Sequence, residues 1–321
     1  MFPTITSGSV SPQVNNVLMM YRNPNYIAQD VMATVPGLVH ENGKIPQMGN
    51  AHLRIYTSKR ALYDTSDHRL NWTINNDATY QIDYYDLDSY IPDRLQQQLQ
   101  APFDAQVAAG KTVMEALMLE RENALAAQLT STSVLTNNTT LSGTSQYTDQ
   151  TNSTPEVDFD TARDSIQSKT GFEANMMIMS RKVANALRRH PWFMEIAKSA
   201  LSGGMPKAGA LSPQALVETL KAWYGLDYVL IGNAIKVTSQ EGQTETKGSV
   251  WGNDVVFAYR APSASLFAPS FGYSFQLEGQ NMRTVIRRHA SDKGDVVEVM
   301  WAYQDAIIDT NCAYLIKDAV A

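Results

Sequence analysis

The sequence has a single cysteine, Cys312, and few charged residues. One cysteine excludes an intrachain disulfide and a cysteine-based metal cage. Charged residues make up 18% of the 321 residues, whereas an average soluble protein has about 25%. Neutral polar side chains replace them, and these cost less free energy than ions when an interface removes them from water. The composition therefore favours wide contact with other proteins.

Long apolar runs and a surplus of basic residues are also absent. No run approaches the roughly 20 apolar residues that span a bilayer. The first residues, MFPTITSGSVSPQ, have neither the basic start nor the apolar stretch of a secretion signal. The net charge of −6 argues against a dedicated nucleic-acid reader, which usually carries a basic field. We expect a globular protein of about two domains, made in the cytosol, with no membrane partner.

Common motifs of catalysis and cofactor binding are missing as well. The five histidines are scattered, without the spacing of a zinc site, and no Gly-x-Ser-x-Gly or Gly-x-Gly-x-x-Gly is present. Gly110-Lys111-Thr112 resembles the end of a phosphate-binding loop, but Ala105 stands where that motif needs glycine. We expect instead that Gly110 ends one helix and that Thr112 and Glu115 form the capping box of the next. No cofactor is expected.

The chain begins with extended segments. Residues 1–50 are rich in proline and have only short apolar runs, so they predict an arm that needs another surface. Residues 51–91 predict a long hairpin, because β-forming runs at His52–Thr57 and Thr79–Ile91 flank a polar tip. A hairpin alone is marginal in water, so this one must lie on something else.

The rest of the chain predicts an α+β protein. Residues 130–154 are rich in Ser, Thr and Asn and predict a loop or loose linker. Periodicity, Pro at helix starts and β-branched runs predict the other elements. The expected helices are Lys111–Thr130, Phe159–Lys169, Arg181–His190 and Ser212–Tyr224; the expected strands are Ala174–Met179, Tyr228–Ile231, Ala234–Val237, Asp254–Arg260, Met282–Arg288, Val296–Ile308 and Ala313–Ile316.

Charge is distributed unevenly. Residues 51–70 carry four basic and two acidic groups, whereas residues 71–110 carry one basic and six acidic groups. A basic hairpin tip beside an acidic base suits head-to-tail contact between identical copies. The candidate intersubunit contacts are Lys59, Arg60, Arg69, Trp72, Asp83, Asp86 and Asp88.

A second basic region covers residues 181–210, with six basic groups and one acidic group. Helical spacing predicts that Arg181 shares a face with Arg188, and Lys182 with Arg189. This candidate basic face can contact the phosphate backbone of DNA, remain solvated, or meet an acidic stretch of another subunit. We favour the last two readings over DNA.

Several segments together resemble a known family. They are Ile91–Leu95 leading into Glu115–Leu125, the strand-then-helix Met176–His190, the helix-to-strand step Trp223–Leu230, the strand Val250–Pro262, and the closing strands Val285–Lys317. In their order and spacing, over nearly the whole chain, they resemble the major capsid proteins of tailed bacteriophages, which have the Hong Kong 97-type capsid fold.

The resemblance implies an α+β fold with named parts. These are an N-terminal arm (1–50), an extended hairpin or E-loop (51–91), a peripheral (P) domain with a long spine helix (92–154), an axial (A) domain (155–265), P-domain strands (266–300) and strands that return to the A domain (301–321).

The resemblance also implies a function. A member of this family is a structural protein, not an enzyme, and self-assembles into hexamers and pentamers of an icosahedral shell around double-stranded DNA, without sequence-specific contacts. The implied partners are copies of itself, a separate scaffolding protein, a portal and, in some members, a decoration protein. The implied location is the virion, after assembly in the host cytoplasm.

Two alternatives stay open. An encapsulin-like cellular nanocompartment shell would have the same fold. An α/β enzyme could use the carboxylates near Asp83–Asp93 as an acid/base pair or a hard-cation site, although alternate positions on one strand that face solvent or a basic neighbour explain them more simply.

Overall fold

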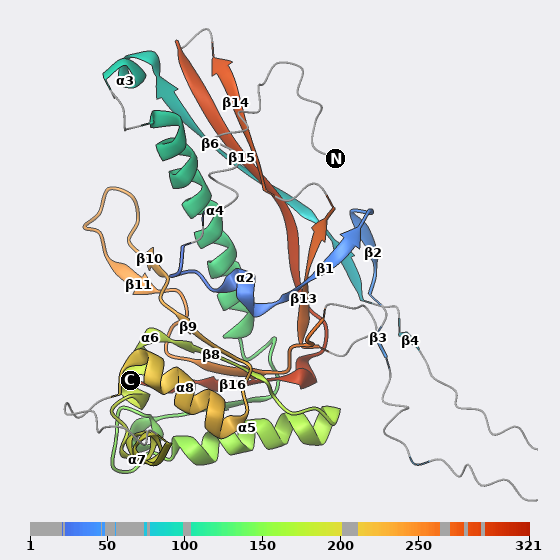
Figure 1. The fold of residues 1–321 in the computed structure, drawn as a ribbon, viewed down its shortest axis with the longest axis vertical. Coiled ribbons are helices and arrows are strands. Elements are labelled where there is room, and N and C mark those ends of the chain that lie inside the picture. Colours follow the sequence, from blue (N-terminus) through green and yellow to red (C-terminus); the bar gives the residue numbers. More distant parts are fainter. Residues whose placement is uncertain are drawn as a thin grey trace, which may run out of the picture.

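The computed structural model describes residues 21, 23–45, 47–48, 55, 74–75, 78–98, 104–200, 211–263, 270–278, 282–289 and 293–321. Two five-stranded sheets, a long helix that runs from one to the other, and a layer of helices at one end make up most of this part (Figure 1). None of its helices is both long and apolar enough to cross a membrane.

The long helix is α4 (Ala105–Leu129), which has 25 residues and therefore extends about 38 Å. Its N-cap is Asp104, whose side chain accepts hydrogen bonds from the N–H groups of Gln106 and Val107. Apolar side chains of its first half pack on one sheet, and those of its last turns pack on the other. The predicted spine helix is therefore present, but it begins earlier than expected.

The capping box predicted inside this helix is wrong. Gly110 is a buried residue in the middle of a continuous helix, and it does not end one. The hydroxyl of Thr112 donates to the carbonyl of Ala108, one turn earlier, instead of capping a new helix. Asp104 already caps the helix, so Gly110-Lys111-Thr112 lies within its regular part.

The first sheet has the order β1-β13-β15-β14, and β6 also pairs with β15. Along most of its length β15 lies between β6 on one side and β14 and then β13 on the other, all antiparallel. The face that packs on α4 buries Ile91, Val297, Val299 and Trp301. The strands are β1 (Ala33–Leu38), β6 (Asp83–Pro92), β13 (Gly272–Leu277), β14 (Arg283–His289) and β15 (Gly294–Ile307).

The expected hairpin strands have different outcomes. The run His52–Thr57 lies, except for Ile55, outside the described residues. The run Thr79–Ile91 does form strands, β5 (Thr79–Gln81) and β6. However, β6 pairs with β15, and β5 pairs with β2 (Asn42–Lys44). This part of the chain is therefore built into the subunit.

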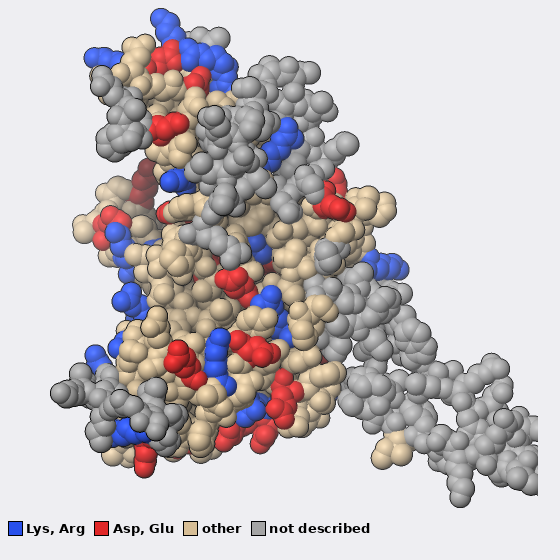
Figure 2. Space-filling model, viewed as in Figure 1, with Lys and Arg blue, Asp and Glu red and all other residues tan. Residues whose placement is uncertain are grey.

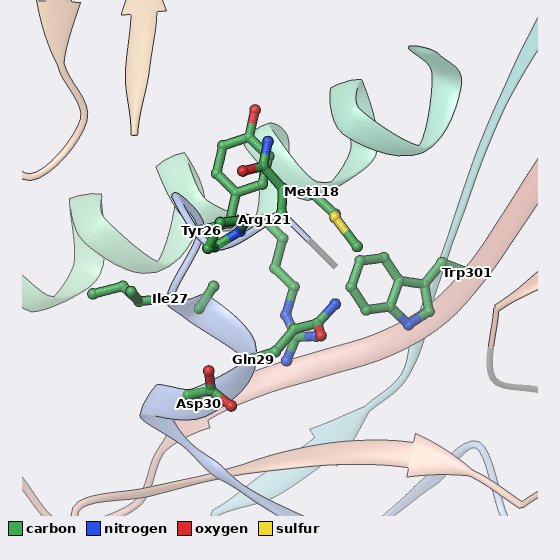
Figure 3. A pocket seen from close by; sticks show the side chains of 10 residues that line it. Tyr26, Ile27, Gln29, Asp30, Met118, Arg121 and Trp301 are labelled. Atoms are coloured by element: carbon green, nitrogen blue, oxygen red, sulfur yellow. The ribbon is translucent and has the colours of Figure 1, made fainter. Parts of the chain in front are cut away.

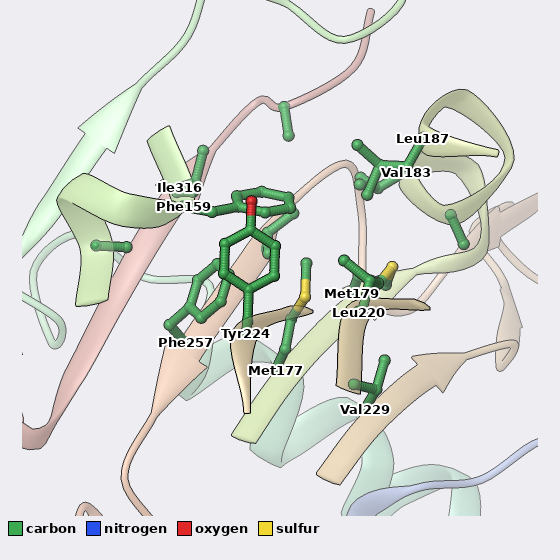
Figure 4. Packing of buried hydrophobic residues seen from close by; sticks show 14 of the residues in the cluster. Phe159, Met177, Met179, Val183, Leu187, Leu220, Tyr224, Val229, Phe257 and Ile316 are labelled. Atoms are coloured by element: carbon green, nitrogen blue, oxygen red, sulfur yellow. The ribbon is translucent and has the colours of Figure 1, made fainter. Parts of the chain in front are cut away.

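The second sheet has the order β7-β16-β12-β8-β9. Helices cover one face, where Phe159, Met177, Tyr224 and Phe257 pack together (Figure 4). The C-terminal turns of α4 cover the other face. The strands are β7 (Asn138–Thr140), β8 (Met176–Ser180), β9 (Tyr228–Gly232), β12 (Val255–Ala258) and β16 (Ala313–Lys317); the helices are α5 (Pro155–Thr170), α6 (Arg181–Leu187), α7 (Pro191–Ala200) and α8 (Pro213–Tyr224).

Residues 130–154 are mostly loop, as their composition predicts, but they are anchored to the subunit and do not form a loose linker. Strand β7 pairs with the end of β16, and the side chains of Leu135 and Tyr147 are fully buried. Tyr147 also packs edge-to-face on Phe159 of α5. A few buried side chains therefore anchor the segment to the second sheet, although most of its residues are exposed.

Part of the predicted arm is likewise integrated. Helix α2 (Ala28–Val31) lies against α4, and β1 adds to the first sheet parallel to β13. The smaller elements complete the described structure: β3 (Gln47–Met48) with β4 (Ile74–Asn75), β10 (Ile235–Val237) with β11 (Lys247–Ser249), α3 (Asp93–Gln98) and the short helical turns η2 (Gly143–Ser145) and η3 (Thr310–Cys312).

Candidate assembly surfaces and the arm–helix junction

The predicted acidic contacts lie on β6 and are exposed. Asp86 and Asp88 lie opposite Met300 and Glu298 of β15. Burial raises the pKa of Glu298, and the two aspartates add to the rise, while its ion pair with Arg287 opposes it. Like charges directly opposite on neighbouring strands are destabilising. This surface therefore favours a cationic partner.

The remaining predicted contacts divide into two groups. Asp83 is exposed and pairs with Tyr303, so it points to the sheet face opposite to that of Asp86 and Asp88. The basic tip residues and their aromatic neighbour lie outside the described residues, and their role as contacts stays a prediction. These are Lys59, Arg60, Arg69 and Trp72.

Asp93, the last member of the acidic cluster, forms an ion pair with Arg288, which holds the pKa of Asp93 below its ordinary value. Arg288 also contacts Asp295 at 3.1 Å, and Asp295 accepts hydrogen bonds from Gln96 and Gln106. The network joins α3 and α4 to β14 and β15. Asp93 is thus engaged structurally, and among the described ranges no three His, Cys, Asp or Glu side chains are grouped to hold a metal.

The predicted basic face is only partly a helix face. Helix α6 ends at Leu187, so Arg188 and Arg189 lie beyond it. Arg188 is half-buried, and its guanidinium donates to the carbonyl of Leu211. Arg181, Lys182 and Arg189 are exposed. Arg188, at the C-cap of α6, is thus engaged within the subunit by Leu211, which precedes the start of α8, and the basic face as a contact surface stays a prediction.

A junction that the sequence did not predict lies in the middle of α4. The carboxylate of Glu122 accepts hydrogen bonds from the N–H groups of Ile27 (3.0 Å) and Ala28 (2.7 Å), and from the indole of Trp251 (2.5 Å). Glu122 is fully buried. Burial raises its pKa, while the three donors and Arg121 oppose the rise. One side chain thus ties the arm, the long helix and the second sheet together.

The preceding residue, Arg121, ties α4 to the first sheet. Its guanidinium donates two hydrogen bonds of 2.7 Å to Asp305 and one of 3.0 Å to Ser274. It also lies over the rings of Trp301 and Tyr303, 4.8 and 4.6 Å from their centroids. The side chains of Arg121 and Asp305 are only 3% and 7% exposed. In the sequence, Arg121 stands at helical spacing with Leu117, Met118 and Leu125, and this position among apolar residues is the signal that could have identified it.

A cavity of about 340 Å³ adjoins this junction. Arm residues 23–30 form one wall, and Met118, Arg121 and Trp301 form the other (Figure 3). The described residues that line it include no Ser, Cys, His or Lys, and the charge of Arg121 is balanced by Asp305. The cavity therefore has the character of a structural seam between arm and helix.

Comparison of the chain with known proteins indicates what role these surfaces and the junction have. No protein-family model matches the chain. The chain is 26% identical over 315 residues to the "Major capsid protein" of Burkholderia phage BcepMu, and the match covers 96% of each sequence. Over nearly its whole length the chain is thus similar to a phage major capsid protein.

Solved structures agree on the fold. A phage-related protein from Bordetella bronchiseptica has a TM-score of 0.73 at 24% identity, covering 98% of this chain and 99% of its own. The capsid of Cyanophage P-SCSP1u has a TM-score of 0.58 at 11% identity, with 99% and 93% covered. An encapsulin complex from Synechococcus elongatus PCC 7942 has a TM-score of 0.52 at 9% identity, with 99% and 90% covered. The predicted α+β Hong Kong 97-type capsid fold is confirmed.

These likenesses change how the carboxylates and cations on the surface are interpreted. Homologous capsid proteins are structural, and their subunits associate in oligomeric shells. Exposed charge on such a subunit is therefore first a candidate for contact between copies. The junction at Arg121 and Glu122 is buried instead, so it belongs to the internal framework of the subunit.

Proposed function

We propose that the chain is the structural subunit of an icosahedral phage head, in which hexamers and pentamers form a shell around double-stranded DNA. The supporting observation is the match along the whole chain to a curated Major capsid protein, together with the capsid fold. In this role the protein performs no catalysis. The net charge of −6 suits a container that does not grip its packed DNA tightly.

The parts of the chain have separate tasks in this proposal. The P and A domains, at 92–154 with 266–300 and at 155–265 with the returning strands 301–321, form the body. The start of the arm (1–50) and the tip of the E-loop (51–91) reach neighbouring copies, while strands β5 and β6 at the end of the E-loop hold it to its own subunit. Basic tip residues of the E-loop then face Asp86 and Asp88 of an adjacent subunit, whose like-charged neighbour Glu298 favours such a partner.

The proposed partners follow from this role. They are copies of the chain, a separate scaffolding protein, a portal, and DNA held without sequence-specific contacts, with a decoration protein where the phage has one. The mature location is the virion, after assembly in the cytoplasm of the host. The acidic-site enzyme is the less favoured alternative, because Asp93 is engaged by Arg288 while Asp86 and Asp88 lie exposed.

Assembly of the purified chain tests the proposal. The protein would be expressed with and without the scaffolding protein encoded beside it, and particles would be imaged by electron microscopy. We expect closed shells with five-fold and six-fold capsomers in at least one of the two preparations. Soluble, folded protein that stays monomeric in both, at high concentration, would refute a shell function.

A second candidate function is the shell of an encapsulin-like nanocompartment, because the fold also resembles that of an encapsulin. The TM-score of this match is lower than those of the Bordetella and cyanophage proteins. Particles isolated from the native source separate the two. A phage head yields double-stranded DNA that resists nuclease until the shell is opened. A nanocompartment yields an enclosed protein cargo and no protected DNA.

A further inference from the structure

The helical layer on the second sheet has two sides. Helix α5 packs against β16 and β12, whereas α6 packs against β8 and β9. Because the sheet order is β7-β16-β12-β8-β9, these two helices lie toward opposite edges of the sheet. Helix α8 contacts both α6 and α7, and Phe159 of α5 contacts Phe193 of α7 and Tyr224 of α8, so the four helices form one layer (Figure 1).

The side formed by α5 is acidic. Asp160 and Asp164 are exposed, one helical turn apart, beside the exposed Val157. No ion pair joins either aspartate to another residue in the described ranges, and Arg163 of the same helix pairs with Glu173 instead. Like charges at this spacing destabilise a helix, so the isolated subunit gains no stability from the pair.

The opposite side is basic. Arg181 and Lys182 in the first turn of α6 are exposed, as is Arg189 beyond its end. None of the three has an ion pair with a described residue; Lys182 has only a 3.3 Å hydrogen bond to Asn253. Basic side chains at a helix N-terminus oppose the helix dipole. Here too the charges do not stabilise the element that carries them.

Among the described residues, no ion pair joins the two charged sides within one copy. Helix α5 lies over β16 and β12 and α6 over β8 and β9, so their centres are about two strand spacings, or roughly 10 Å, apart. This is slightly more than the Debye length of about 8 Å at physiological ionic strength, so salt weakens the attraction between the two sides. Figure 2 shows acidic side chains gathered over α5 at the lower edge of the molecule. Contact between copies would bring the two signs together.

We propose that Asp160 and Asp164 of one copy bind Arg181, Lys182 and Arg189 of the next copy in a head-to-tail ring. The inference rests on the proposed shell function and names one contact within the capsomer. A heterologous contact of this kind closes into a ring when the rotation between copies divides a full turn. Complementary charge fixes the register of the contact. It also disfavours contact between two acidic sides or between two basic sides.

Charge reversal tests this contact. The variant pairs are Asp160→Lys with Asp164→Lys, and Arg181→Glu with Lys182→Glu. Each pair places like charges in the contact, so we expect the shell yield to fall at least about tenfold at physiological salt. Combining all four substitutions restores complementarity and returns the yield to within about threefold of wild type. Glu241→Lys with Glu245→Lys, on the exposed loop between β10 and β11, makes the same change in net charge as the aspartate pair, away from the contact, and should assemble normally.

Mixing the two reversed proteins gives a second test that does not require either to assemble alone. A ring in which they alternate has complementary charges at every contact, but only an even number of copies allows strict alternation. Six-membered rings should therefore form, whereas every five-membered ring retains one like-charged contact. We expect sheets or tubes of hexamers in place of closed shells.

The possible outcomes distinguish failure of this contact from failure of the proposed shell function. If the wild-type chain forms no shells, the proposed function and this contact fail together. If it does, normal assembly of both reversed pairs overturns the contact alone. So does failure of the fourfold variant while its circular dichroism and melting temperature match wild type. A basic-side variant that assembles normally but retains less DNA would assign those residues to DNA instead.

Discussion

The buried pair of Arg121 and Asp305 offers the sharpest test of how the subunit holds its shape. Replacing Asp305 by leucine leaves a guanidinium that is 3% exposed with only Ser274 and two aromatic rings as partners. Removing one partner of a buried ion pair costs about 3–5 kcal/mol, because the remaining charge is not compensated. We expect Arg121→Met to cost a similar amount, since it leaves the carboxylate of Asp305 buried.

The double variant has a different expectation. With both charges gone, apolar side chains fill the space between α4 and the first sheet, and the remaining losses are the cation–π contacts and one hydrogen bond to Ser274. These amount to about 1–3 kcal/mol. The two single effects therefore do not add, and the coupling energy should exceed about 2 kcal/mol.

Chemical unfolding of the unassembled subunit measures this cycle. Circular dichroism would follow the helices, and tryptophan fluorescence would follow the surroundings of Trp301, which stacks on Arg121. All four proteins would be compared at the same concentration, below that needed for assembly. Additive single effects, or single effects each below about 1 kcal/mol, would show that the pair does not hold α4 to the sheet in the manner described here.

Three further predictions concern other parts of the described structure. The substitution Glu122→Gln places an amide NH₂ against at least one of the N–H groups that donate to Glu122. We therefore expect the free energy of unfolding to fall by about 2–4 kcal/mol and the backbone amide of Ala28 to exchange faster. Unchanged exchange would contradict the anchoring role of Glu122. Burial, with Asp309, raises the pKa of the Cys312 thiol to about 12, so a thiol reagent at about pH 8 should react only after unfolding; native labelling would contradict the burial. Arg288 lowers the pKa of Asp93 from its ordinary 3.8, so the stability of this pair is present above that pH and is lost as the pH falls through the lowered pKa. The melting temperature of Arg288→Gln should therefore lie below that of wild type near neutral pH and approach it in acid, whereas a constant difference would exclude the ion pair as its cause.

Local signals explain why the helices after Pro155 could be predicted from the sequence. Ser212 precedes Pro213, and its hydroxyl accepts a hydrogen bond from the N–H of Ala215. The start of α8 is therefore determined by neighbouring residues. Its end is equally local, because Gly225 adopts a left-handed conformation with φ of 65°. Such elements require no knowledge of the rest of the fold.

Edge strands were missed for the opposite reason. The strand β1 contains Pro36 and Gly37, which weaken a strand pattern, and a register shift between Val35 and Leu38 accommodates them where β1 lies at the sheet edge. The short β7 contains only polar residues and is a strand because β16 lies beside it. In both cases the pairing partner, distant in sequence, determines the conformation.

The candidate assembly surfaces were only partly predictable. Counting acidic and basic residues along the chain identifies charged segments. Four of the residues in these segments, Asp86, Asp88, Arg181 and Lys182, are exposed in the structure. What the sequence could not show is which of the basic residues fold inward, as Arg188 does. That depends on a carbonyl 23 positions away, and only the tertiary structure brings the two together.

The position of Arg121 and Glu122 bears on how such a subunit can build a closed shell. The first half of α4 packs in one apolar cluster and its last turns pack in another, with these two charges between them. Apolar contacts alone tolerate sliding, whereas a buried charge that loses its partners costs several kcal/mol. The charged junction therefore stabilises the observed orientation of the two sheets over its alternatives. In a ring, any angular error in one subunit is repeated at every contact, so a fixed orientation is what ring closure requires.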